Sequence, residues 1–205
     1  MKRFVTVIAA LVAMVSAYSQ NTDLLERMYE DVSDSCVEMT YTYSTRMYGT
    51  KTVGSGNLVA QGNLWHMDGN GLQMWCDSED VWVVDSKSKE VVIEPAAGGG
   101  SGYTSNPALL FINLQNAFKV STARDTDDGG AMLYVLVPQV ECPFEYANVV
   151  IRKSDASITS GSFILKDGNV LDITVSSMKC LPKKPESEFR PKTSFGQDWI
   201  VTDLR

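Results

Sequence analysis

The residue types that most often carry catalysis or hold metals are sparse in this chain. His66 is the only histidine. The cysteines are widely separated along the sequence, at Cys36, Cys76, Cys142 and Cys180. A zinc site needs closely spaced Cys and His ligands, and a nucleophile needs a base beside it. We therefore expect no metal, no cofactor and no catalytic residue, and we predict that the protein is not an enzyme.

The same residue types have plain structural interpretations. Alternation along a strand places His66 opposite Trp65 and Met67, on a polar face. The acidic run Asp77-Ser78-Glu79-Asp80 is typical of a solvated turn. Four cysteines allow three disulfide pairings, and buried free thiols are an equal alternative. The sequence does not choose between disulfides and free thiols.

The N-terminal residues have the pattern of a secretory signal peptide. Lys2 and Arg3 precede an apolar run at 4–15 and small residues at 16–19. We predict a signal peptide at 1–19 and a single mature domain at 20–205. The formal net charge is −7, and removal of 1–19 makes the chain more acidic. An acidic exported protein is a poor ligand for nucleic acid or anionic membranes, and we expect no stable membrane anchor.

Apolar residues alternate with polar ones in the first half of the mature chain. This two-residue period predicts a long strand at 36–48 and an antiparallel meander at 54–95. One face of this sheet is then apolar, and it must either be filled or hold a ligand. The residues predicted to line it are Val37, Met39, Tyr41, Tyr43, Met47, Leu58, Trp65, Met67, Leu72, Met74 and Trp82.

Two segments have helical spacing instead. The first runs from Asp23 to about Ser35, and the second begins at Asn106-Pro107, after a glycine-rich loop at 98–102. Either helix is a movable lid or an ordinary core helix, and the pattern fits both. The residues predicted to face the sheet are Leu25, Met28 and Val32 in the first helix and Leu110, Phe111 and Leu114 in the second.

Strand patterns return in the second half, at 132–137, 147–152, 157–165, 170–178 and 199–205, with a loop-like stretch before the last of these. The whole pattern is mainly β (α+β). It predicts a curved antiparallel sheet of about ten or eleven strands and two helices.

Several short motifs occur in an order that is similar to one family. They are Gly56-Asn57-Leu58, Leu64-Trp65-His66-Met67, the hairpin at 77–85, Asn106-Pro107 and the closing Val201-Thr202-Asp203-Leu204-Arg205. In this order they resemble the periplasmic lipoprotein carriers of the LolA-like family. The chain departs from the family at Gln61-Gly62-Asn63, where members often carry a basic residue and a proline. The sequence therefore does not show which residues hold the lid closed.

The resemblance implies a function that the residues alone do not give. The implied fold is an incomplete, half-open antiparallel β-barrel covered by an N-terminal helix and a mid-chain lid helix. The implied function is that of a soluble, monomeric periplasmic carrier that holds the acyl chains of lipoproteins in an apolar cavity and delivers them to the outer membrane. Its partners would be acylated lipoproteins, a lipoprotein-releasing transporter of the inner membrane and an outer-membrane acceptor. The alternative is a periplasmic lipid- or lipoprotein-sensing regulator on the same fold.

Overall fold

The computed structural model describes residues 24–47, 50–96 and 108–205, with only the backbone of residue 47. Four features expected from the sequence lie outside these ranges: the signal peptide at 1–19, the helix start at Asp23, the glycine-rich loop at 98–102 and Asn106-Pro107.

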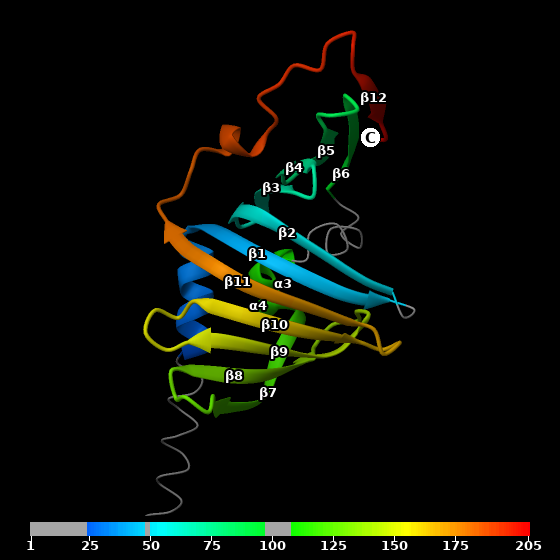
Figure 1. The fold of residues 1–205 in the computed structure, drawn as a ribbon. Coiled ribbons are helices and arrows are strands. Elements are labelled where there is room, and N and C mark those ends of the chain that lie inside the picture. The colour runs from blue at the N-terminus through cyan, green and yellow to red at the C-terminus, as the bar shows by residue number, and fades with distance from the viewer. Residues whose placement is uncertain (1–23, 48–49, 97–107) are drawn as a thin grey trace, which may run out of the picture.

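The described residues form one twelve-stranded sheet that does not close into a barrel (Figure 1). The strand order is β12-β6-β5-β4-β3-β2-β1-β11-β10-β9-β8-β7, and every neighbouring pair is antiparallel except β12 and β6. The strands are β1 Cys36–Met47, β2 Thr50–Gln61, β3 Leu64–Gly69, β4 Leu72–Asp77, β5 Asp80–Asp85, β6 Glu90–Pro95, β7 Phe118–Asp125, β8 Ala131–Pro138, β9 Phe144–Arg152, β10 Ile158–Leu165, β11 Val170–Leu181 and β12 Ile200–Asp203. This open, mainly β architecture confirms the predicted fold class.

Short helices cover one side of the sheet. They are an N-terminal helix at 24–34, α3 (Leu109–Ile112) and α4 (Leu114–Ala117). The second predicted helix is therefore broken, because Asn113 lies between α3 and α4 and its side-chain amide donates to the Leu109 carbonyl at 3.1 Å. Strand β7 begins directly after α4, where no strand pattern was visible in the sequence. None of the helices among the described residues is long and apolar enough to cross a membrane.

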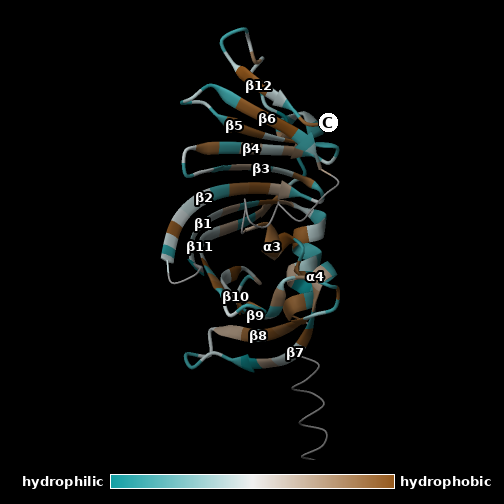
Figure 2. Cartoon of the chain, turned by 90° about the vertical axis from the view of Figure 1, so that its right-hand side faces the viewer, coloured by the Kyte–Doolittle hydropathy of each residue, from teal (hydrophilic) through white to brown (hydrophobic). Residues whose placement is uncertain are grey.

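The sheet curves around these helices, so it has a concave inner face and an outer face. Figure 2 shows α3 and α4 on one side of the strands. The main apolar cluster lies between them, where inward residues of β1–β5 and β8–β11 meet the helices. The single layer of sheet is thus stabilised mainly from its concave side, by burial of apolar surface against short helices.

The segment after β11 crosses the outer face of β3–β6 before it forms β12 (Figure 1). We call residues 182–199 the strap. It contains a short 3-10 helix, η1 (Glu186–Phe189), which contacts β3 and β4. The sequence suggested a loose loop here, yet Phe189 is only 1% exposed. The strap gives β3–β6 a second apolar layer on the outer side.

Candidate binding site on the concave face

The first half of the concave face is built by residues that alternate along β1–β5. Cross-strand pairing places Met39 opposite Leu58, Leu58 opposite Met67, and Met67 opposite Met74. These form one apolar row across four strands. The predicted lining residues that are buried in the main cluster are Val37, Met39, Tyr41, Leu58, Trp65, Met67 and Met74, and Tyr43 packs against that cluster at its margin.

Three predicted lining residues stand apart from this group. Leu72 is on β4 but is 37% exposed. The side chain of Met47 lies outside the described residues. Trp82 was assigned to the wrong face: it pairs with Trp75 and Ile93 and belongs to the outer cluster beneath the strap. Its neighbours Val81 and Val83 are the inward residues of β5, so the count of alternation was displaced by one residue.

The second half of the concave face comes from β8–β11 and was not included among the predicted site residues. Tyr134, Val149 and Ile173 are fully or almost fully buried there. Phe118, Phe144 and Phe163 form an aromatic group with ring centroids 5.7–6.1 Å apart. The signal for these residues is the strict alternation of apolar and polar residues in β8, β9 and β11.

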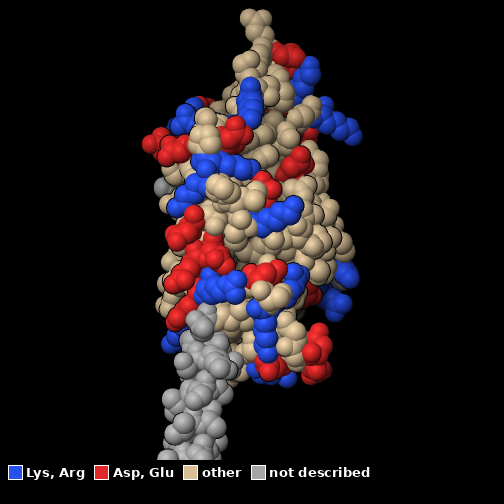
Figure 3. All heavy atoms as spheres, turned by 90° about the vertical axis from the view of Figure 1, so that its left-hand side faces the viewer, with Lys and Arg blue, Asp and Glu red and all other residues tan. Residues whose placement is uncertain are grey.

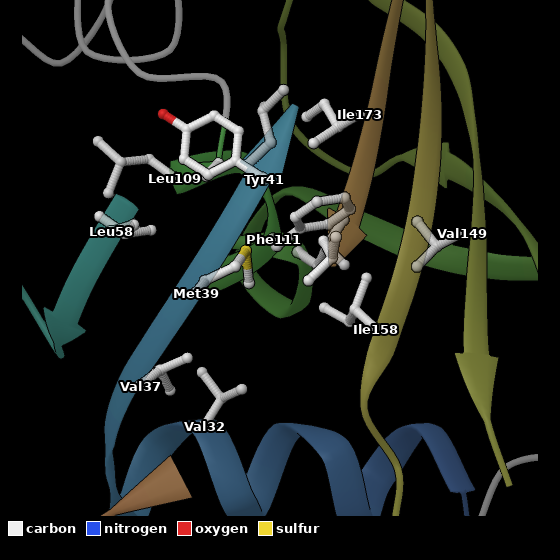
Figure 4. Packing of buried hydrophobic residues seen from close by; sticks show 14 of the residues in the cluster. Val32, Val37, Met39, Tyr41, Leu58, Leu109, Phe111, Val149, Ile158 and Ile173 are labelled. Carbon is white, nitrogen blue, oxygen red and sulfur yellow. The ribbon is translucent and has the colours of Figure 1, made fainter. Parts of the chain in front are cut away.

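The N-terminal helix lies against the concave face through residues three and four apart. Leu25, Met28 and Val32 are all buried in the main cluster. Figure 4 shows Val32 directed toward Val37 of β1. Burial of this face places the helix over the sheet, as expected for either a core helix or a closed lid.

Side chains of α3 and α4 lie at the middle of the concave face. Leu110, Phe111 and Leu114 are 3%, 1% and 0% exposed, and Figure 4 shows Phe111 among residues from both halves of the sheet. The ring of Phe111 lies directly on the backbone of β10. A Cβ atom added at Gly161 would be 2.6 Å from Phe111 Cε1. Gly161 therefore provides the space that Phe111 fills.

Two tyrosines cover glycines on the first half of the face. Tyr41 lies opposite Gly56 and Tyr43 opposite Gly54. Side-chain atoms of these tyrosines are 2.8 Å and 2.5 Å from where a Cβ would lie. The Tyr41 hydroxyl reaches Met67 Sδ at 3.3 Å, and burial raises the pKa of Tyr41. The face is thus lined by rings lying flat on backbone.

The helices that cover this face leave a surface hollow between them. A surface hollow of about 170 Å³ lies between the N-terminal helix and α4, lined by Glu26, Tyr29, Glu30, Ser33 and Gln115. Tyr29 is half-buried beside Tyr134, and burial raises its pKa to about 12. The two helical elements therefore meet at a polar boundary.

The outer face of β3–β6 is not the wet surface expected from the sequence. His66 does point to the other face of β3 from Trp65, as expected. It is stacked on Trp75 there, at a ring-centroid distance of 4.9 Å. Its Nε2 atom is buried, and no group in the described part of the chain forms a hydrogen bond with it. Burial lowers the pKa of His66, and Lys184 and Lys192 lower it further, although Asp68 acts in the opposite direction. His66 is a neutral packing residue in this position.

Ion pairs fasten the strap and the C-terminal end to the first half of the sheet. Asp77, expected to be solvated, has only 4% of its side chain exposed and pairs with Arg190 at 2.6 Å. Its burial opposes ionisation, but backbone N–H groups of Asp80 and Glu79, together with Arg190, lower its pKa overall. Arg205 contacts Asp80 at 2.7 Å. The hairpin and closing motifs of the sequence therefore meet in space.

Gln61, which stands where the family often has a basic residue and a proline, binds the strap. Its side-chain amide donates to the Lys184 carbonyl at 3.1 Å and accepts from the Lys184 N–H at 2.7 Å. The Lys184 ammonium also contacts Glu38 at 2.7 Å. Gln61 therefore anchors the start of the strap on the outer side.

The concave face is lined by apolar side chains. Nowhere in the described ranges do three or more His, Cys, Asp or Glu residues gather closely enough to hold a metal. The four cysteines are free thiols, and burial raises the pKa of Cys36, Cys76 and Cys180. On the surface, Figure 3 shows positive and negative side chains interspersed.

Comparison with known structures gives the fold a context. The chain is similar to an uncharacterized conserved protein from Thermus thermophilus, with a TM-score of 0.56 and 14% identity over 90% of this chain and 99% of that one. It is also similar to a DUF1329 family protein from Desulfovibrio piger, with a TM-score of 0.50 and 13% identity over 84% and 96% of the two chains.

A LolA superfamily protein from Nitrosomonas europaea aligns over 83% of this chain and 97% of its own, with a TM-score of 0.46 and 13% identity. No protein-family model and no curated protein matches the chain. At these identities a likeness shows fold alone. The chain therefore shares the fold of the Thermus and Desulfovibrio proteins, a curved open sheet with helices on its concave side.

Proposed function

We propose that this protein is a periplasmic carrier that binds the acyl chains of lipoproteins on the concave face of its sheet and delivers them to the outer membrane. The observation that carries the proposal is Phe111, a large apolar side chain on a four-residue helix that lies at the middle of the apolar concave face. An apolar guest that binds on this face would take the place of this ring.

The cover supports exchange because little regular structure holds it. Helices α3 and α4 have four residues each and no side-chain cap at their N-termini. Helices this short have little stability of their own, so they remain in place through burial of Phe111 and its neighbours. An apolar ligand that occupies the place of Phe111 would remove most of the burial that stabilises the closed arrangement of the helices.

The magnitudes allow binding that is still reversible. Each methylene removed from water contributes about 0.8 kcal/mol, so ten methylenes contribute roughly 8 kcal/mol. Displacing Phe111 would cost roughly 3–5 kcal/mol, by analogy with Phe-to-Ala changes in protein cores, and this cost reduces the net free energy of binding. The closed helices thus compete with cargo and assist its release. Lipoproteins are the proposed cargo through the family resemblance, with a releasing transporter and an acceptor as partners.

The direct test is binding of a fluorescent fatty acid to delipidated protein. We expect stoichiometric uptake, and tighter binding by Phe111→Ala, because that variant lacks the competing ring. The matched control is Phe189→Ala, since Phe189 is equally buried but belongs to the strap on the outer side. Its affinity should equal that of the wild type. Absence of uptake by both wild type and Phe111→Ala would contradict the proposal.

A second assay separates a carrier from the alternative, a lipid-sensing regulator. A carrier should release lipoproteins from inner-membrane vesicles together with the releasing transporter, and should yield them to outer-membrane vesicles. A regulator would take up the fatty acid but leave the lipoproteins in the first vesicles.

A further inference from the structure

The outer face of the sheet has three bands of different chemistry. Over β3–β6 it is aromatic and aliphatic, with Trp75, Trp82 and Ile93. Over β2, β1 and β11 it is polar and carries exposed residues such as Thr42, Asn57 and Thr174. Over β8–β10 it becomes apolar again. The polar band needs no cover, but each apolar band does.

The chain itself covers the first apolar band. Phe195 and Trp199 of the strap pack against Val84, Val91 and Ile93, and the two strap rings contact each other at a centroid distance of 5.1 Å. A segment without regular strands thus converts an exposed apolar face into a second small core.

The other apolar band has no comparable cover among the described residues. The outward residues of β8 pair with those of β9, since Leu133 lies opposite Val150 and Val135 opposite Asn148. The outer apolar patch, as we call it, consists of Leu133, Val135, Val137, Tyr146, Val150 and Ile164. All six are partly exposed, and none belongs to either apolar cluster of the described residues.

Charged residues flank the patch with opposite signs on its two sides. On β7, Lys119 and Arg124 share the outer face, opposite Val137 and Leu133. On β11, Asp172 shares it and accepts a hydrogen bond from Ser162 at 2.7 Å. Neither cation forms an ion pair within the described ranges of the chain. The rim is therefore basic along the sheet edge and acidic on the side toward the polar band.

One row of paired residues shows how the basic side of this rim can face the acidic side of a second copy. The register runs straight across the five strands, with Thr122 opposite Val135, Val135 opposite Asn148, Asn148 opposite Ser162, and Ser162 opposite Asp172. A two-fold axis along β9 would place β7 of one copy over β11 of the other. Asp172 of the second copy would then lie over Thr122, between Lys119 and Arg124.

The centre of the row suits the same symmetry. Asn148 lies on β9, at the axis, and an amide can both donate to and accept from its own copy. A self-complementary surface is what a two-fold interface requires. We propose that the outer apolar patch is a homodimer interface in which two sheets pack face to face. This departs from the monomer expected from the sequence, and it does not depend on acyl binding at the concave face.

Sedimentation equilibrium between about 1 and 100 µM tests the dimer. We expect a monomer–dimer equilibrium that shifts toward monomer at high salt, because the rim pairs are solvent-exposed. Val135→Glu should abolish association, since it would bury a carboxylate beside the axis, within the apolar part of the interface. Thr42→Glu, on the polar band, is the matched control and should associate like the wild type. Circular dichroism verifies that all variants are folded.

Charge reversal tests the proposed geometry. Asp172→Lys should weaken dimerisation roughly tenfold or more, as should the pair Lys119→Glu and Arg124→Glu together. Mixing the two reversed proteins should restore a heterodimer, because both of its rims again pair opposite charges. A wild type that remains monomeric throughout would overturn the proposal. So would a dimer unaffected by Val135→Glu, or a monomer whose patch instead binds anionic vesicles or a different protein.

Discussion

Glycines within the strands decide where aromatic rings can lie. Gly54, Gly56 and Gly161 each face a ring at a distance that no Cβ atom tolerates. A glycine inside a strand weakens it unless another group approaches closely, and here the approaching group is a ring. In the sequence, Gly54 begins the predicted meander, Gly56 belongs to a short strand motif, and Gly161 lies inside the predicted strand at 157–165. The sequence does not show their partners, because the pairing of Phe111 with Gly161 joins an α-helix and a strand fifty residues apart.

The Phe111–Gly161 contact gives a sharp prediction. Gly161→Ala should destabilise the closed protein by about 1–3 kcal/mol, as overpacking usually does. The same variant should bind the fluorescent fatty acid more tightly, because the closed form is strained. Chemical unfolding and the binding assay measure the two effects.

Phe111→Leu in the Gly161→Ala background provides the control, since a smaller side chain relieves the clash. The cost of Gly161→Ala should be smaller there, giving a nonzero coupling energy in a double-mutant cycle. Additive effects would show that the two residues do not compete for the same space.

His66 predicts a pH dependence of stability. Its pKa is lowered in the folded protein, mainly by burial, so the unfolded chain binds the proton more readily. The contribution of neutral His66 to the free energy of unfolding should be fully present above about pH 6.5, the pKa of histidine in the unfolded chain. This contribution should be lost as the pH falls below that value. The charged groups near it are Asp68, Lys184 and Lys192.

Urea unfolding between about pH 7.5 and 5, which spans the ordinary histidine pKa, measures this loss. His66→Gln should flatten the slope in that range, because the replacement does not titrate there. An unchanged slope in His66→Gln would assign the pH dependence to other groups.

At the scale of elements, strands with strict alternation were predictable and covering segments were not. β1 and the meander β2–β6 follow the two-residue alternation of their sequence. The strap has no period, so its buried Phe189 and its contact with Asp77 could not be read from neighbours in sequence. β7 was missed because it follows α4 directly and its residues after Phe118 are mostly polar and exposed. Tertiary packing decided these elements.

The strap predicts a measurable contribution from one ion pair. Arg190→Gln leaves the buried Asp77 carboxylate with only its two backbone N–H donors. We expect a loss of about 1–3 kcal/mol in unfolding free energy and faster proteolysis within the strap. Lys192→Gln is the control, because its pair with Glu188 is exposed and should contribute less than about 0.5 kcal/mol. Equal effects of the two variants would show that Asp77 does not depend on Arg190.

At the scale of the whole molecule, the open mainly β fold and its concave apolar face were predictable from the sequence. Periodicity determines which residues share a face, and this placed seven of the proposed lining residues in the main cluster. Periodicity does not show which faces are covered from outside. The cover that the strap gives to Trp75 and Trp82 on the outer face was therefore not predicted.

The position of β1 has a consequence for how the chain folds. β1 is the first strand in sequence but lies in the middle of the sheet, beside β2 on one side and β11 on the other. Its pairing with β2 is local, whereas Cys36 meets Leu181 only after most of the chain has been made. During synthesis, the edge of β1 that later pairs with β11 stays unpaired until β11 has been made. Unpaired strand edges are sites of aggregation. Closure of β1 onto β11 is therefore the slow, topology-limited step that joins the two halves.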